Sequence, residues 1–575
     1  MRKVLFLATL ALSLAASAGE RSRSEMRSIA QRYLPIASYV KGQTSQNPDS
    51  QLRCTHESQA YAVFEQTGTE AFVVVSKSNL APEVIGYSQT TFSEESMSPD
   101  LRWFLSLAES NILAAERTGK PLLTSRRAPQ QPVDPFITTL WTQSDPFNLK
   151  TPRNYPAGCV AVAMAQAINY CRHPSRVNFR GYCYVTETDN SKRYVVDSLD
   201  INAIYFYPYL DLYGRATTAQ KNSVASLVRD CGYATLMRYA KSGSGTYLFL
   251  AGSALTTYYS YPEESVKYAE RDCFGGTQEE WNQIIYDEMQ LRCPVLYGGA
   301  DEDAGGHAFV FCGLDADGLV YVNWGWGASG NGFYDIALLN PAEDQYTVAQ
   351  NMVYGLRSKA LPTDIPEPRI YSYDGEPYTF SFTNETDDEG QKHVTLNISV
   401  TAGLANMTPS KMDGEFGIFG TDITTGQNWQ IRDTDKDIWE PGAGFTLQSP
   451  SMIYYYYVEK EMIPGHTYRI SFGTRDKREG QWHSIIAHGG ELGYEIYYTG
   501  DPATCTISEQ MKPLYDGVAA PRTSSLSATD GMTRVYDTAG RLIYTAPTTQ
   551  FNLWDVPARG ILVVEQGGQS RKVVR

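Results

Sequence analysis

The spacing of hydrophobic residues in the first part of the chain predicts a mixture of helices and strands. Residues 25–34 form a polar stretch that predicts a helix, and residues 101–115 also have a helical pattern. The strand-like runs at 61–64 and 71–75 predict strands. Residues 130–362 mix helix and strand signals in the same way. This two-thirds of the chain is therefore expected to be α+β.

From about residue 363 the pattern predicts strands only. Residues 393–400 and 468–472 alternate strictly between apolar and polar side chains, which is typical of an antiparallel β-sandwich. After a stretch rich in Ser, Ala and Thr, three short apolar runs predict a small terminal sheet, at residues 534–537, 541–544 and 560–564. The expected architecture is thus an α+β part followed by two β parts.

One predicted helix carries candidate chemistry at its start. Pro156 and Gly158 favour an irregular entry, and the apolar positions that follow fall on one helix face: Val160, Met164, Ala167, Ile168 and Cys171. Cys159 therefore lies at the helix N-terminus, where the dipole and free N–H groups lower a thiol pKa and offer a donor to an oxyanion. A nucleophile and a buried structural cysteine both fit this position.

A thiolate nucleophile needs a base, and the chain has only seven histidines. His173 closes the same helix, about 20 Å from Cys159 at 1.5 Å per residue, which excludes it if the helix is continuous. His56 lies in the N-terminal part, and the β-rich part holds four more: His393, His466, His483 and His488. His307 remains as the candidate base.

The surroundings of His307 fit a base. It follows two glycines at the start of an apolar strand, and the turn at 315–318 reverses the chain into a second strand that ends at Asn323 and Trp324. We expect this hairpin to bring Asn323 to the imidazole, where its amide would hold the useful tautomer, and Trp324 to shield the pair from water. A structural histidine beside core tryptophans is the alternative.

Charge and length bear on the class of protein. The formal net charge is -15 over 575 residues, and the basic residues are not clustered, which argues against nucleic-acid binding. His483 and His488 lack a set of neighbouring carboxylates or thiols, so we interpret them as surface residues and expect no metal site.

The N-terminus predicts export. Arg2 and Lys3 precede an apolar stretch at 4–14 and small residues at 16–18, the pattern of a secretory signal peptide. Nine cysteines is an odd number, so at least one thiol must stay unpaired within the chain. The basic pair Arg126 and Arg127 opens a turn-prone stretch that we interpret as an exposed linker.

Three sequence blocks together resemble the streptopain family of papain-like cysteine proteases. They are Gly158-Cys159-Val160-Ala161 with its Ala-rich helix, Gly305-Gly306-His307-Ala308-Phe309-Val310, and Val322-Asn323-Trp324-Gly325-Trp326-Gly327. The resemblance implies a papain-like α+β fold, with Cys159 and His307 as catalytic residues and no cofactor. It also implies that Gln143 completes the oxyanion hole and that Ser244 and Gly306 contact the substrate.

Residues 71–76 and 82–88 are similar to the inhibitory prosegment of that family. This similarity favours a maturation cut near Arg126 and Arg127 over a simple interdomain linker. The last residues resemble the C-terminal sorting domain of proteins exported by the type IX system of Bacteroidetes. The resemblances imply protein or peptide substrates, the chain's own propeptide as an intramolecular inhibitor, and the export machinery as a partner of the C-terminal domain.

The expected organisation follows from these patterns and resemblances: signal peptide 1–18, inhibitory propeptide 19–127, papain-like catalytic domain 128–362, β-sandwich 363–510, linker 511–529 and sorting domain 530–575. The expected function is a secreted or cell-surface cysteine endopeptidase made as a zymogen. Two alternatives stay open: an inactive papain-like adhesin that acts through its β-domain, and acyl transfer other than hydrolysis at the same site.

Overall fold

The computed structural model describes residues 19–39, 52–95, 97–122, 131–187, 193–207, 210, 216–274, 276–301, 305–339, 350–372, 378–386, 388–400, 404–433, 437–441, 444–445, 452–457, 462–487, 490–491, 493–507, 532–536, 542–547, 561–566 and 569–574. The predicted signal peptide and the Arg126–Arg127 pair lie outside these residues. All nine cysteines lie within them and are free thiols. Among the residues so placed, no helix is long and apolar enough to cross a membrane.

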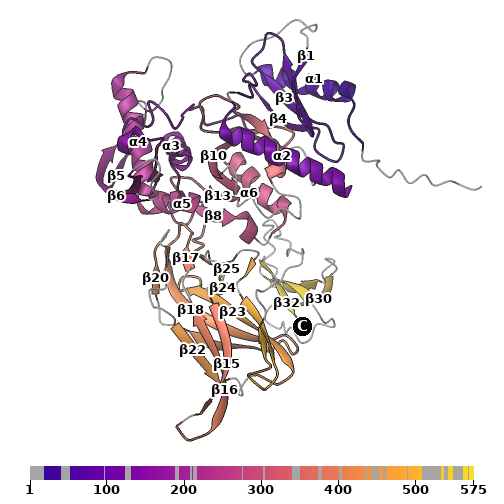
Figure 1. Cartoon of the computed structure of the whole chain (residues 1–575), viewed down its shortest axis with the longest axis vertical. Helices are drawn as coiled ribbons and strands as arrows, with labels where there is room; N and C mark the ends of the chain where they lie inside the picture. The colour runs from indigo at the N-terminus through magenta and orange to yellow at the C-terminus, as the bar shows by residue number, and fades with distance from the viewer. Residues whose placement is uncertain are drawn as a thin grey trace, which may run out of the picture.

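The N-terminal unit, residues 19–122, is a four-stranded antiparallel sheet between two helices (Figure 1). Its elements are α1 (Arg23–Tyr39), β1 (Leu52–Glu57), β2 (Tyr61–Gln66), β3 (Phe72–Ser76), β4 (Val84–Ser88) and α2 (Pro99–Thr118). Alternate residues of β3 explain the two helices: Val73 and Val75 pack toward α1, whereas Phe72 and Val74 join the core that contains α2. These elements confirm the predicted helices and strands of this part.

The central unit, residues 131–361, mixes helices with strands, which confirms the α+β prediction. Its elements are η1 (Pro152–Asn154), α3 (Cys159–Cys171), β5 (Arg176–Thr186), β6 (Tyr194–Ile204), α4 (Thr218–Ala234), β7 (Arg238–Tyr239), α5 (Leu248–Thr257), β8 (Lys267–Glu270), η3 (Arg271–Cys273), α6 (Gln278–Gln290), β9 (Val295–Asp301), β10 (Gly305–Leu314), β11 (Val320–Asn323), β12 (Gly332–Tyr334), η4 (Ile336–Leu339) and β13 (Asn351–Tyr354). The hairpin predicted at 315–318 joins β10 to β11, and Asn323 pairs with Val310.

The two units share one sheet of ten strands, in the order β1-β2-β3-β4-β12-β11-β10-β9-β13-β8. The joint is the antiparallel pairing of β4 with β12, in which Gly332 lies opposite Ser88. Only glycine fits there, because a Cβ at Gly332 would lie 2.2 Å from the carbonyl oxygen of Tyr87. The N-terminal unit is therefore hydrogen-bonded to the central unit as an extension of its sheet (Figure 1).

Two tyrosines of the N-terminal unit also reach the β10–β11 turn. Tyr87 donates to Asp315 at 3.0 Å and Tyr33 donates to Asp317 at 2.7 Å. Burial raises the pKa of the Asp315 carboxyl to about 6, although N–H groups of the turn and Tyr87 act in the opposite direction. The charged form of Asp315 is thus disfavoured in the folded chain.

We predict a pH-dependent gain of stability in Asp315→Asn. A raised pKa gives stability that is present below the unfolded value, near 3.8, and is lost as pH rises through about 6. The melting temperature of the variant should therefore rise relative to that of the parent between pH 4 and pH 7. The charge of Asp317 also raises the pKa of Asp315, so Asp317→Asn should move the pH-dependent loss of stability to lower pH. A stability difference between Asp315→Asn and the parent that stays constant with pH would contradict the prediction.

Residues 370–507 form a two-layered β structure below the central unit (Figure 1). The strands are β14 (Ile370–Ser372), β15 (Tyr378–Thr386), β16 (Lys392–Val400), β17 (Leu404–Asn406), β18 (Met412–Asp422), β19 (Asn428–Asp433), β20 (Asp437–Trp439), β21 (Gly444–Phe445), β22 (Met452–Tyr457), β23 (His466–Asp476), β24 (Trp482–Ser484), β25 (Ile486–Ala487), β26 (Gly490–Glu491), β27 (Gly493–Tyr498) and β28 (Thr506–Ile507). Leu396 and Ile398 of one sheet share a core with Ile418 and Phe472 of another. The predicted strands at 393–400 and 468–472 are confirmed.

The C-terminal residues form a four-stranded sheet in the order β30-β29-β31-β32. Its strands are β29 (Met532–Tyr536), β30 (Leu542–Pro547), β31 (Ile561–Gln566) and β32 (Gln569–Val574). The three predicted apolar runs fall on the first three of these strands.

A carboxylate of the central unit holds the β-sandwich. Glu263 accepts from Arg478 at 3.1 Å and from the backbone N–H of Lys411 at 2.9 Å, and its carbonyl oxygen accepts from Ser410 at 2.9 Å. Nearby, Thr256 of α5 donates to the carbonyl oxygen of Pro409 at 2.7 Å. These polar contacts act together with Tyr371, Ala405 and Met407 of the sandwich, which belong to the buried core of the central unit.

We predict that Glu263→Ala weakens this docking by about 1 kcal/mol, because a half-exposed charged acceptor of two hydrogen bonds is lost. Limited proteolysis should then separate the sandwich faster than in the parent. Glu264→Ala removes the same charge from the adjacent position and serves as the control. Equal rates for the two variants would contradict the assignment of the contact to Glu263.

Candidate active site

The entry to α3 fixes the position of Cys159. Gly158, the N-cap, has a φ of 88°, a conformation that favours glycine, and a Cβ there would lie 2.6 Å from the methyl carbon of Met237. Cys159 opens the helix and is half-buried, whereas the ten residues after it are buried. The predicted place of this thiol at a helix N-terminus is confirmed.

The thiol is held in its protonated form. Burial and, to a smaller extent, the negative charge of Asp100 raise the pKa of Cys159 to about 12, although nearby backbone N–H groups act in the opposite direction. Sequence analysis expected the helix N-terminus to lower this pKa. Desolvation and a neighbouring carboxylate, which lies in the N-terminal unit, outweigh that effect here.

The same carboxylate holds His307. Asp100 Oδ1 lies 3.1 Å from Nδ1 of the imidazole, and the other ring nitrogen, Nε2, is buried without a hydrogen-bond partner among the described residues. The indole of Trp103 stacks on the ring with centroids 5.5 Å apart. Trp103 in turn fills the space over Gly299, where a Cβ would lie 2.6 Å from the indole. Within the described structure the imidazole therefore hydrogen-bonds to Asp100 and makes no hydrogen bond to the Cys159 thiol.

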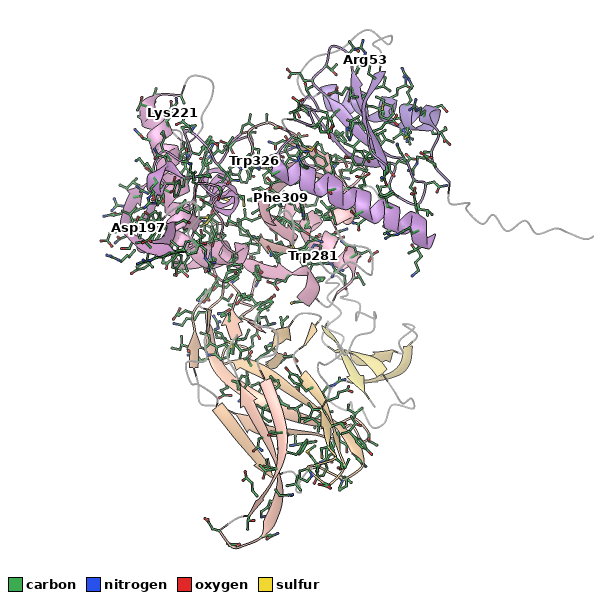
Figure 2. The ribbon with its side chains drawn as sticks, in the orientation of Figure 1. Arg53, Asp197, Lys221, Trp281, Phe309 and Trp326 are labelled. Carbon is green, nitrogen blue, oxygen red and sulfur yellow. The ribbon has the colours of Figure 1, made fainter. Side chains whose placement is uncertain are left out.

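Asp100 is placed by the start of α2. Ser98 caps this helix by accepting from the N–H of Leu101 at 3.2 Å, and Pro99 occupies the first turn. The side chain of Asp100 is 1% exposed, and its second oxygen accepts from the indole N–H of Trp326. Figure 2 labels Trp326 and Phe309 beside α2. The helix N-terminus, the imidazole and the indole together stabilise this buried charge.

Asn323 makes no hydrogen bond to His307 among the described residues. Its Nδ2 donates to the carbonyl oxygen of Thr139 at 2.8 Å and to Gln166 Oε1 at 3.3 Å, and its Oδ1 accepts from the N–H of Gly325 at 3.1 Å. Asp100 takes the place at the imidazole that the sequence assigned to the Asn323 amide.

Trp324 is fully buried next to β10. Its ring meets Phe309 and Tyr334 edge-on, at 4.8 and 5.3 Å between centroids, and also contacts Phe104 of α2. Its indole donates to the carbonyl oxygen of Gly330 at 3.0 Å. The ring therefore excludes water from the end of the β10–β11 hairpin.

The other predicted site residues lie around Cys159 or at the strand of His307. The carbonyl oxygen of Gln143 accepts from Ala157 N at 2.9 Å, which ties Gln143 to the loop that enters α3. The Ser244 carbonyl oxygen lies 3.3 Å from the Cβ position of Gly158. Gly306 is exposed on β10, with no atom within 4 Å of its Cβ position, so the strand before His307 is open to an approaching chain.

Sequence reasoning missed the residues that join distant segments. Asp100 lies 207 positions from His307, and only the Ser98-Pro99 helix-start signal marked its surroundings. Trp103 gave no signal beyond hydrophobicity, and Trp326 lies in the third resemblance block but was assigned no role. Gln166 is a buried amide in an apolar helix, and that contrast was visible in the sequence.

The histidines that were excluded do not join the site. His173 contacts the carbonyl oxygen of Ser260 at 3.1 Å, and His483 contacts Glu479 at 2.6 Å. His488 lies outside the described residues.

We predict that Asp100→Asn makes Cys159 more reactive in the full-length chain. Loss of the charge lowers the thiol pKa, and each unit of pKa raises the thiolate fraction about tenfold. Alkylation by iodoacetamide at pH 8, followed by peptide mass spectrometry, should show at least a threefold faster rate at Cys159. Cys54, the exposed thiol, reports reagent access in both proteins, and an unchanged ratio of the two rates would refute the prediction.

Comparison with known proteins gives two family matches. Residues 141–334 match the model of the peptidase C10 family, and residues 20–112 match the model of the Spi protease inhibitor. Similar proteins include the thiol protease/hemagglutinin PrtT of Porphyromonas gingivalis, 28% identical over 55% of this chain and 39% of that protein. Streptopain of Streptococcus pyogenes is 27% identical over 48% of this chain and 73% of its own length.

The solved structure of a Prevotella intermedia prointerpain A fragment is 34% identical and covers 54% of this chain and 99% of the fragment, with a TM-score of 0.49. The matched region thus spans well under half of PrtT but nearly all of the prointerpain fragment.

Proposed function

The chain belongs to the peptidase C10 family of cysteine peptidases, and we propose that it is an endopeptidase made as a zymogen, with Cys159 as nucleophile and His307 as base. The observation that carries the proposal is the convergence of three groups. The thiol at the first position of α3 and an imidazole are both under the influence of one carboxylate from the N-terminal unit. An active cysteine peptidase needs the thiol and the imidazole. The carboxylate of Asp100 is the group that accounts for latency.

The proposed reaction uses the thiolate of Cys159 and the imidazolium of His307. The thiolate attacks the peptide carbonyl carbon, and the N–H of Cys159 and the amide of Gln143 bind the oxyanion. His307 then gives its proton to the leaving amine as the C–N bond breaks. Water attacks the resulting thioester, His307 takes its proton, and the carboxylate product leaves the thiol. Ser244 and Gly306 are proposed to bind the substrate backbone next to the bond that is cut.

The proposed latency depends on Asp100. Its carboxylate engages Nδ1 of His307 and helps to raise the pKa of Cys159, so the thiol is kept protonated and the imidazole is held by the N-terminal unit. Cleavage in the stretch that contains Arg126 and Arg127, followed by loss of α2, would remove the charge and Trp103 together. The N-terminal unit is then an intramolecular inhibitor, in keeping with its match to the Spi inhibitor model.

We further propose that the protein is exported and acts at or beyond the cell surface. The basic, apolar and small-residue segments of residues 2–18 support export, and the small terminal sheet is a candidate for recognition by the export machinery. Folded or unfolded proteins and peptides outside the cell are the proposed substrates.

The test compares the full-length chain with a chain that begins at residue 128. We expect the shorter protein to cleave casein and the full-length protein to be nearly inert, because only the longer one carries Asp100. In the shorter protein, Cys159→Ala and His307→Ala should each remove at least 99.9% of the activity without changing the melting temperature by more than a few degrees.

Cys171→Ala is the matched control, since it makes the same substitution at the other end of α3 and should keep the activity. A Cys159→Ala protein with full activity would rule out the proposed nucleophile. Equal activity of the two chain lengths would rule out the proposed latency.

A further inference from the structure

We propose that one end of the β5–β6 hairpin is a second binding surface for the protein substrate, outside the catalytic site, and that it takes an extended segment with apolar or aromatic side chains. We call it the hairpin surface and define it by five residues: Tyr182, Tyr184, Tyr194, Val195 and Val196. The inference rests on the proposed function, because it needs a peptidase that acts on proteins.

The hairpin surface is apolar and exposed. Strands β5 and β6 form an antiparallel pair at the margin of the central unit (Figure 1). One face of the pair is buried in the core through Cys183, Val185 and Ile201. On the other face and at the start of β6, the exposed fractions are 42% for Tyr182, 45% for Tyr194, 46% for Val195 and 60% for Val196. Adjoining exposed apolar residues of this kind indicate a binding surface, whereas single ones do not.

The first three residues of β6 also form an unprotected sheet edge. The sheet has the order β6-β5-β7, so β6 pairs on one side only among the described strands. Tyr194, Val195 and Val196 are consecutive, apolar and exposed, whereas the acidic Asp197 and Asp200 protect the middle of the strand. Natural edges avoid such apolar runs unless the run has a function, because an edge readily adds an extended chain. The surface therefore fits an extended peptide segment.

One row of paired residues joins the hairpin surface to the candidate active site. Val196 lies opposite Tyr184, and Tyr184 lies beside Arg238 of β7. Arg238 and Gly245 exchange two backbone hydrogen bonds, at 3.0 and 3.2 Å. Gly245 follows Ser244, whose carbonyl oxygen lies at the entry to α3. The hydrogen-bonded strands thus continue from the hairpin surface to the loop that is proposed to bind the substrate backbone.

The length of this row decides which substrates reach the hairpin surface. Three strand spacings of about 4.8 Å place Val196 about 14 Å from Gly245. An extended chain covers about 3.3 Å per residue, so a segment bound at Gly245 needs about four more residues to arrive. A hexapeptide cut at its centre has only three residues on either side of the bond. The surface is therefore expected to act on proteins and long peptides alone.

Charge favours a substrate segment over a second copy of the chain as the occupant. The guanidinium of Arg238 lies 5.9 Å from the ring centroid of Tyr194 and makes no ion pair within the described structure. Two copies that docked here about a two-fold axis would bring both Arg238 cations into one interface, where like charges repel. A single extended segment meets one cation, which also attracts aromatic side chains.

The experiment compares two substrates that contain the same bond. A hexapeptide and a twenty-residue peptide are centred on a bond that the parent enzyme cuts in denatured casein. The variant is Tyr182→Thr/Tyr194→Thr/Val196→Thr, because threonine keeps the preference for a strand and removes most of the apolar surface. Each full-length precursor is processed by a trace of tagged parent enzyme, which is then removed on its tag. Active sites are titrated with an irreversible thiol-directed inhibitor.

We expect kcat/KM of the triple variant to fall about tenfold for the long peptide, mainly through KM, and to stay within twofold for the hexapeptide. Val196→Thr alone should lower the value for the long peptide about twofold, and it carries the test if the triple variant does not fold.

Ile204→Thr/Phe206→Thr is the matched control. These residues are 67% and 56% exposed, as apolar as the hairpin surface, and lie at the far end of the hairpin. Ile204 is about 26 Å from Val196 at 3.3 Å per residue of β6. The control should cleave both peptides as the parent does.

The outcomes separate the two levels of the proposal. An unchanged kcat/KM for the long peptide, or an equal loss for both peptides, overturns the hairpin surface and leaves the proposed function intact. A processed parent that sediments as a dimer, together with a monomeric triple variant, would assign the surface to a second copy and also overturn the inference. A processed parent that cuts no bond in casein would refute the proposed function itself.

Discussion

The pairing of β4 with β12 is the constraint on which the latent site depends. It joins the N-terminal strands to the central sheet in a fixed register, so that α2, which covers one face of those strands, must lie across the central strands as well. Asp100 and Trp103 reach His307 because the sheet, and not a flexible linker, sets their position. A shift of register by one residue would turn the side chains of β4 to the wrong faces and release both contacts.

A buried carboxylate is costly, and the structure shows how the cost is offset. Asp100 lies in the first turn of a helix, next to one imidazole and one indole N–H, so each oxygen has a donor. The arrangement lasts only while the start of α2, the imidazole of His307 and the indole of Trp326 stay together. The donors to the Asp100 carboxylate belong to the central unit, so its burial favours docking of the N-terminal unit. Its negative charge also disfavours the negatively charged thiolate of Cys159.

Local pattern was enough to predict the elements but not their long-range contacts. The spacing of Val160, Met164 and Ile168 predicted α3, because a helix face follows from spacing within one segment. The turn at Asp315 predicted the hairpin for the same reason. The ten-stranded sheet was not predicted, since pairing between β4 and β12 depends on residues almost 250 positions apart. Asn323 was expected at the imidazole, and the competing carboxylate could not be seen, because Asp100 is an ordinary helix-start residue in its own segment.

The junction of the two units leaves an edge when they part. Without β4, the strand β12 becomes the border of a six-stranded sheet, and unpaired N–H and C=O groups at such borders are templates for association between chains. Here the exposed border spans only Gly332–Tyr334, and Asp335 and η4 follow at once. A strand this short offers few backbone groups for pairing with another chain. The three residues that pair with the N-terminal strands in the precursor therefore form a border with a low risk of aggregation once those strands are gone.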